Sequence, residues 1–241
     1  GDEGDAWRPP PEHAGLDQQH GRAAEGHGPA GGGDAAVRGG AAGADLLKNL
    51  GQLEEARLLL EEALQASKET LGDRHARTLG LINSMGQLLQ YMGQLKEARP
   101  PYEEALQSSR ETLGDRHPST LGSIGNMGVL LQNMGHPEEA RQLFEEALLA
   151  LRETLGDRHP DTLASIGNMG LLLQNMGQLK EAMPLFEEAL QARRETLGDR
   201  HADTLISINS MGSLLKAMGQ LKEAMSLLEE ALQARRETLG D

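Results

Sequence analysis

The sequence predicts an all-α fold, a solenoid in which antiparallel helix pairs stack along the chain. The first observation is an internal repeat: the string LGDRH begins at Leu71, Leu113, Leu155 and Leu197, which is once every 42 residues. The second is that apolar residues within each repeat recur three and four positions apart, as on one face of a helix. The third is that one helix pair cannot bury its own apolar face, whereas stacked pairs can.

Residues 1–43 do not carry the repeat, and their Gly-, Ala- and Pro-rich composition leads us to expect disorder. Their codons suggest an origin for this segment. A set of codons permitted for Asp5–Ala14 encodes ETLGDRHPST when it is read in a frame that begins two bases earlier, at the GA that a Gly4 codon can supply. Continuing in that frame through Gly40 gives one complete repeat unit. We therefore interpret residues 1–43 as a repeat translated out of frame, a hypothesis that sequencing the transcript tests.

Residues 44–241 form the expected array, with a partial first unit and then four units of 42 residues. In the first unit only Asp45–Leu50 remains of the first helix, and the second helix is expected over Gln52–Thr70. The later first helices are expected to begin near Arg77, Ser119, Asp161 and Asp203. Both ends of the array present apolar faces that no further helix covers, which indicates a fragment of a longer array or end-to-end stacking.

The first helix of each unit is clearest after Pro160. Asp161 or Thr162 is expected to cap it, because a short side-chain oxygen can accept a backbone N–H. Gly177 is expected to end it, since glycine adopts the left-handed conformation at little cost. Its apolar stripe comprises Leu163, Ile166, Met169, Gly170, Leu173 and Met176.

The second helix of the same unit is expected to end near Leu197–Gly198. In an earlier unit the corresponding helix contains Pro100–Pro101, and we expect the second proline to kink or weaken it. The apolar stripe of the second helix comprises Leu179, Ala182, Phe186, Ala189 and Leu190.

One unit carries a recognisable set of residues: Met127–Gly128, Leu131, Gly135, Ala140, Phe144 and Ala147. Their types and spacings resemble the signature of the tetratricopeptide repeat (TPR), and the resemblance covers about residues 44–241. The 42-residue unit and its G-D-x-H-P-like loops resemble the kinesin light chain subgroup. The resemblance implies a right-handed superhelical solenoid that binds other proteins.

Composition limits the partners and the compartment. The formal charge of −14 argues against nucleic acid, because an acidic protein repels phosphates. No apolar run is long enough to cross a bilayer, and no apolar signal-peptide core is present at the start, so we expect a soluble cytoplasmic protein. The absence of cysteine excludes disulfides and Cys-ligated zinc.

Two patterns invite a chemical interpretation. His75, His117, His159 and His201 recur once per unit, but successive units lie about 10 Å apart, too far for one metal ion to be shared. We interpret these histidines as tying the loops between units. The Asp–Arg–His strings around them repeat without a nucleophile or a phosphate-binding loop. We therefore expect no metal, no cofactor and no enzymatic activity.

The resemblance also implies a ligand groove on the concave surface, lined by the first helices. Its carboxamides could bond a peptide backbone of any sequence, and Val129 and Leu171 could seat apolar side chains. The implied residues are Ser84, Gln87, Gln90, Tyr91, Asn126, Val129, Gln132, Asn133, Asn168, Leu171, Gln174, Asn175, Ser210, Ser213 and Lys216, with Ala217 beside them.

The function that follows is a non-catalytic scaffold or adaptor that binds a peptide segment of a partner protein, as a kinesin light chain-like cargo adaptor would. Two alternatives stay open from the sequence. The array could be the sensor or oligomerising region of a larger signalling protein, or it could be a fragment of a decayed repeat gene.

Overall fold

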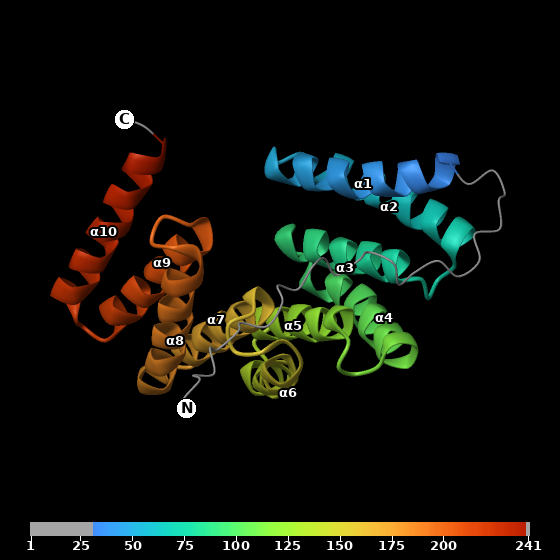
Figure 1. Cartoon of the computed structure of the whole chain (residues 1–241). Helices are drawn as coiled ribbons and strands as arrows, with labels where there is room; N and C mark the ends of the chain where they lie inside the picture. Colours follow the sequence, from blue (N-terminus) through green and yellow to red (C-terminus); the bar gives the residue numbers. More distant parts are fainter. Residues whose placement is uncertain (1–30, 240–241) are drawn as a thin grey trace, which may run out of the picture.

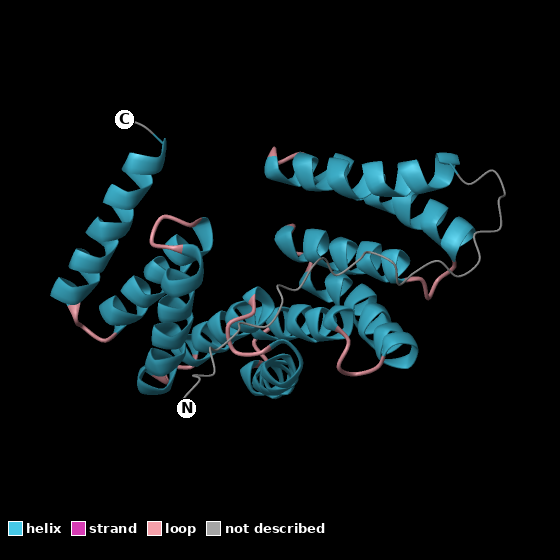
Figure 2. Cartoon of the chain, in the orientation of Figure 1, coloured by secondary structure: helices cyan, strands magenta, loops and turns pink. Residues whose placement is uncertain are grey.

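A computed structural model describes residues 31–239 of the chain as helices joined by short turns (Figure 2). The helices are α1 (Gly31–Asn49), α2 (Leu53–Leu71), α3 (Ala76–Tyr91), α4 (Leu95–Leu113), α5 (Pro118–Asn133), α6 (Pro137–Leu155), α7 (Pro160–Asn175), α8 (Leu179–Leu197), α9 (Ala202–Ala217) and α10 (Leu221–Leu239). Odd-numbered helices are called A helices here and even-numbered ones B helices. Within the described residues no helix is long and apolar enough to cross a membrane.

Each A helix packs against the B helix that follows it and, from α3 onward, against the B helix of the preceding unit. The stack curves into an arch, with α1 and α10 at its two ends and α6 on the outside (Figure 1). Adjacent A helices also touch, because α3 contacts α5, α5 contacts α7 and α7 contacts α9. The predicted right-handed superhelical solenoid of antiparallel helix pairs is confirmed.

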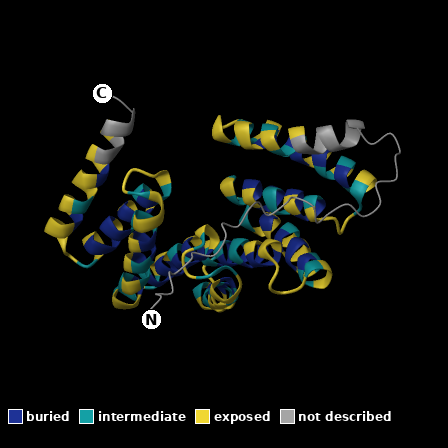
Figure 3. Cartoon of the chain, viewed as in Figure 1, coloured by how far each residue is buried: buried dark blue, intermediate teal, exposed yellow. Residues whose placement is uncertain are grey.

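The core lies between the two layers of helices, and the exposed residues lie on the outward faces (Figure 3). Within a unit, the B-helix aromatic residue packs on the glycine of the A helix. A Cβ atom added to Gly128 would lie 2.6 Å from the Phe144 ring, and one added to Gly170 would lie 2.8 Å from the Phe186 ring. Glycine is therefore required at these positions by the close approach of the side chain.

The A helices from α3 onward begin one residue before their expected starts, at Ala76, Pro118, Pro160 and Ala202, but the cap differs from the expectation. The N-cap of α7 is His159, whose Nδ1 accepts the backbone N–H of Asp161 at 3.2 Å, and neither Asp161 nor Thr162 is the cap. His75, His117 and His201 cap α3, α5 and α9 in the same way. The histidine directly precedes the first helical residue in every case, whether that residue is proline or alanine, so its side chain reaches an N–H group of the first turn.

The ends of the helices agree with expectation. Gly177 follows α7 with φ +77°, and Gly198 ends α8 with φ +84°. The two prolines of α4 do not interrupt it, since α4 has the same length as the other B helices from α2 onward. Pro100 lacks the N–H that would bond the backbone carbonyl four residues earlier. Because Pro100 lies on the exposed side of the helix, water can bond that carbonyl instead.

The N-terminal boundary also differs. Helix α1 begins at Gly31, whereas the sequence led us to expect ordered structure only from Asp45. Gly40 and Gly43 let α1 approach α2 closely: a Cβ at Gly40 would lie 2.5 Å from the Ala63 Cβ. Glycine at positions 40 and 43 therefore permits the close contact between α1 and α2. Residues 1–30 lie outside the described residues, so the out-of-frame origin stays a hypothesis.

Candidate functional site

The inner surface of the arch is formed by one face of each of α3, α5, α7 and α9. We call this surface the concave face and define it by six positions on each A helix. These are Gly80, Asn83, Ser84, Gln87, Gln90 and Tyr91 on α3; Gly122, Gly125, Asn126, Val129, Gln132 and Asn133 on α5; Ala164, Gly167, Asn168, Leu171, Gln174 and Asn175 on α7; and Ile206, Asn209, Ser210, Ser213, Lys216 and Ala217 on α9. Each of these residues is half-buried or exposed.

The face is continuous because its six positions follow helical spacing. Residues three, four and seven apart lie on one side of a helix, whereas the intervening residues turn into the core. On α5, for example, Met127 and Leu130 are buried beside the half-buried Asn126 and Val129. Every residue that the sequence suggested for the groove lies on this face, although its role in binding stays a prediction.

Some carboxamides of the concave face are bonded to each other. Gln87 Nε2 donates to Asn126 Oδ1 at 3.4 Å, which joins α3 to α5. Gln174 Nε2 donates to Ser213 Oγ at 3.0 Å, which joins α7 to α9. These contacts orient the amides of Gln87 and Gln174 and use part of their bonding capacity.

Two amide oxygens on this face have no hydrogen-bond partner. The Oε1 atom of Gln174 is buried without one, while its Nε2 atom bonds Ser213. The Oδ1 atom of Asn83 is in the same state, while its Nδ2 atom donates to Ser123 Oγ at 2.9 Å. Buried polar atoms are usually paired, so these two acceptors are the least satisfied part of the face.

Apolar side chains are distributed unevenly on the concave face. Val129 packs partly against the core, whereas Leu171 is 40% exposed and Ile206 is 57% exposed. Tyr91 is 67% exposed at the α3 end. The other tyrosine, Tyr102, is buried beneath the face, where its hydroxyl donates to Gln90 Oε1 at 3.3 Å.

Sequence reasoning missed part of this face. It omitted the exposed position at the start of each stripe, which holds Gly80, Gly122, Ala164 and Ile206. It also omitted Asn83 and Asn209 and the glycines between them. The seven-residue spacing from Gly80 to Gln87 would have indicated that both lie on one helical face.

The charges of the described residues lie elsewhere. The concave face holds no Asp or Glu, and Lys216 is its one cation. The B helices carry the glutamates, which form ion pairs between successive units: Arg110 to Glu146 at 2.6 Å and Arg152 to Glu188 at 2.6 Å. Apart from Lys216, the inner surface of the solenoid is therefore uncharged, whereas its outer surface is charged.

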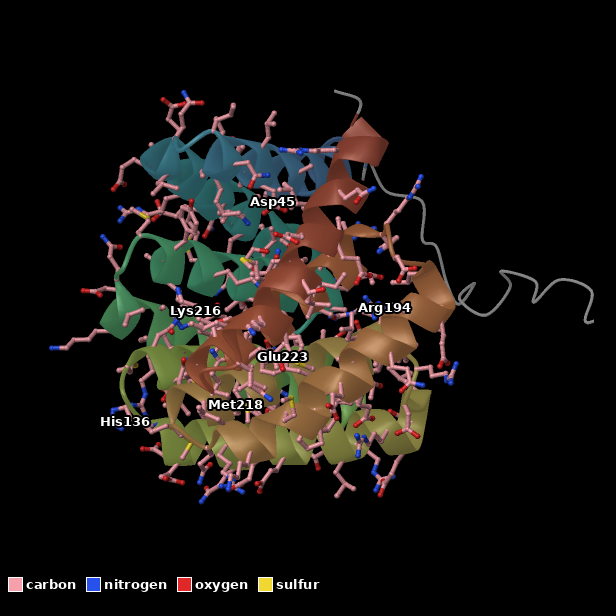
Figure 4. All side chains as sticks on the ribbon, turned by 90° about the vertical axis from the view of Figure 1, so that its left-hand side faces the viewer. Asp45, His136, Arg194, Lys216, Met218 and Glu223 are labelled. Carbon is pink, nitrogen blue, oxygen red and sulfur yellow. The ribbon has the colours of Figure 1, made fainter. Side chains whose placement is uncertain are left out.

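The far end of the array is open within the described residues. Leu228 and Leu232 of α10 are 39% and 52% exposed, although Phe186 and Leu190, one unit earlier, are buried under α9. Figure 4 views the molecule from this end, where Met218 and Glu223 lie near the turn between α9 and α10. A cavity of about 520 Å³ lies beside α10, lined by Leu215, Lys222, Glu223, Ser226, Leu227 and Glu230.

The four loop histidines are committed to capping. Each uses Nδ1 to accept a backbone N–H, and each comes from a different unit. Among residues 31–239, no group of three His, Asp or Glu side chains is arranged to hold a metal ion.

The stacked helix pairs, with an inner surface that is uncharged except for Lys216, define a helical repeat scaffold. The tetratricopeptide repeat family matches residues 43–111, 76–148, 119–195 and 161–237. The chain therefore belongs to the tetratricopeptide repeat family, whose members are protein-interaction scaffolds. No curated protein matches the sequence.

Solved structures agree with this assignment. The nearly identical TPR-like repeats assigned to a kinesin light chain of Podosopora anserina are 29% identical, with a TM-score of 0.67, over 86% of this chain and 98% of that one. BtubC (BKLC) of P. vanneervenii is 23% identical, with a TM-score of 0.72, over 87% and 83%. NprR, in complex with its cognate peptide NprX, is 16% identical, with a TM-score of 0.66, over 85% and 57%. The array is thus of the kinesin light chain-like type.

Proposed function

We propose that the chain binds a segment of a partner protein along its concave face. The observation that carries this proposal is the repeated, accessible surface of α3, α5, α7 and α9, which is uncharged except for Lys216. Residues chosen only for solubility are usually charged, as they are on the B helices of this chain. The concave face instead presents carboxamides, which offer both donors and acceptors to a peptide backbone.

The fold supports the same proposal. NprR shares the solenoid fold and was solved in complex with its cognate peptide NprX, which supports a peptide segment as the ligand here. The tetratricopeptide fold is typically a non-catalytic scaffold, and we propose a binding role without catalysis here as well. Adaptation of a cargo to a motor is one form that this function would take in a kinesin light chain-like array.

The test compares two double variants of the whole chain. Asn126→Arg with Asn168→Arg places two large cations on the concave face, whereas Gln142→Arg with Gln191→Arg adds the same charge to exposed positions of B helices. Partners are captured from cell lysate and identified by mass spectrometry. We expect the first variant to lose a partner that the parent and the second variant retain, with all three equally helical. Equal capture by both variants would contradict the assignment of the face.

A further inference from the structure

The concave face carries the same set of side chains twice in succession. Asn126, Gln132 and Asn133 of α5 recur as Asn168, Gln174 and Asn175 of α7, and Val129 corresponds to Leu171. Because α5 and α7 are in direct contact, the two sets are separated by the distance between packed helices, about 8–10 Å. A partner that uses both sets must present equivalent groups at this spacing.

The spacing favours one backbone conformation. A polyproline II segment has three residues per turn and rises about 3.1 Å per residue, so every third side chain returns to the same side after roughly 9 Å. In a β-strand, residues three apart point to opposite faces. The polyproline II repeat therefore matches the distance between α5 and α7, whereas a strand would direct alternate residues away from the groove.

An α-helix would meet the spacing but not the chemistry. Two helical turns advance about 11 Å, which is close to the separation of the two sets. However, a helix pairs its own backbone groups and would leave the carboxamides of Asn126 and Asn168 facing side chains alone. A polyproline II segment has no internal hydrogen bonds, so its carbonyls and N–H groups are free to bond the amides.

The charge distribution restricts the side chains of the partner. The six concave positions of α5 and the six of α7 contain no charged residue. A charged partner side chain held over them would lose water without gaining a counter-charge. The groove over α5 and α7 therefore selects an uncharged stretch, although the outer surface of the protein is acidic.

The floor of this part of the groove allows close approach. A Cβ atom added at Gly122, Gly125 or Gly167 would have nothing within 4 Å, so packing within the chain does not require glycine there. Glycine lowers the stability of a helix interior, but it leaves the helix backbone uncovered. A partner backbone can reach the carboxamides on either side of these glycines.

We propose that α5 and α7 together bind an uncharged partner segment in the polyproline II conformation, with side chains three residues apart directed at Val129 and Leu171. This inference rests on the proposed function, because it names the chemistry of the segment that the concave face binds.

The first test is selection of a phage-displayed library of random peptides on the whole chain. Each selected peptide is then tested against Leu171→Glu and against Leu149→Glu, which alters an exposed leucine of α6. We expect the peptides lost with Leu171→Glu but kept with Leu149→Glu to be uncharged over their central residues, with apolar residues three apart. Charged peptides, or apolar residues at helical spacing, would overturn the inference and leave the proposed function intact. If Leu171→Glu loses no peptide, the proposed function fails together with the inference.

A second test uses designed peptides and fluorescence anisotropy. A peptide of repeated Leu-Pro-Gln triplets is compared with a peptide of the same composition in which leucine occupies alternate positions, and with one in which each Gln is replaced by Glu. We expect both controls to bind at least about tenfold more weakly, a difference that is readily measured. Equal binding of the triplet peptide and the alternating peptide would refute the three-residue spacing. Stronger binding of the Glu peptide would refute the requirement for an uncharged segment.

Discussion

Two glycines of α5 provide a matched pair for testing how the units pack. Gly125 lies on the concave face, where an added Cβ would have nothing within 4 Å, whereas at Gly128 it would lie 2.6 Å from the Phe144 ring. Phe144 is fully buried, so its ring has no free space into which to move. Alanine substitution at the two positions therefore changes helix propensity equally and core packing differently.

The magnitudes follow from these two terms. Gly125→Ala should stabilise the array by about 1 kcal/mol, the difference in helix propensity between the two residues. Gly128→Ala gains the same term but overpacks the core, which costs about 1–3 kcal/mol. We therefore expect Gly128→Ala to be less stable than Gly125→Ala by about 1–3 kcal/mol.

The assay is urea unfolding of the whole chain followed by circular dichroism. Both variants change one residue of the same helix and have the same number of repeats. Their free energies of unfolding can therefore be extrapolated to zero urea in the same way and compared directly. If Gly128→Ala proves as stable as Gly125→Ala, the close contact between Gly128 and Phe144 is wrong, and so is our account of how each A helix packs on its B helix.

Three further predictions concern capping, ion pairs and a buried tyrosine. His117→Ala should destabilise the array by about 1 kcal/mol, because the N–H of Ser119 loses its acceptor, and His117→Ser should restore most of this in thermal melts. Arg152→Met should lower the free energy of unfolding by only about 0.2–1 kcal/mol, because the Arg152–Glu188 pair is exposed. High salt should reduce this difference from the parent in urea unfolding. A difference that salt does not change would argue against an ionic origin. Burial raises the pKa of the Tyr102 phenol above the value of about 10 in an unfolded chain. The folded state therefore holds this proton more tightly, so stability should fall as pH rises above about 10, and Tyr102→Phe should flatten that fall in unfolding measured at several alkaline pH values.

The sequence was sufficient to predict the repeat architecture. The 42-residue period located every helix pair from α3 onward, and the glycines at Gly177 and Gly198 located the helix ends. These features are local, because the conformational freedom of glycine and the spacing of apolar residues determine them directly.

The errors arose where two local signals compete. Asp161 is a better N-cap by residue type than His159, but the helix already begins at Pro160. The corresponding helices begin directly after their histidine even where the first residue is Ala76 or Ala202, and the histidine becomes the cap. Residues 31–43 are a second case, because Gly40 and Gly43 indicate disorder by composition, although here they allow α1 to pack on α2.

The candidate site was predictable only in part. The helical faces follow from sequence spacing, so the positions of Asn126 and Asn168 were accessible to reasoning. The bonds from Gln87 to Asn126 and from Gln174 to Ser213 were not, because they depend on the distance between A helices of different units. The contrast between an uncharged inner face and a charged outer one likewise required knowledge of which face is concave.

Site-specific photo-crosslinking tests the central claim most directly, namely that the concave face binds the partner. A photo-reactive amino acid is placed at Leu171 on the concave face or at Leu149 on the outward face of α6, both exposed leucines. After irradiation in cell extract, we expect position 171 to form covalent adducts with a partner protein. We expect position 149 to form no adduct with that partner. Adducts with the same partner from position 149 alone would contradict the claim and place binding on the B helices.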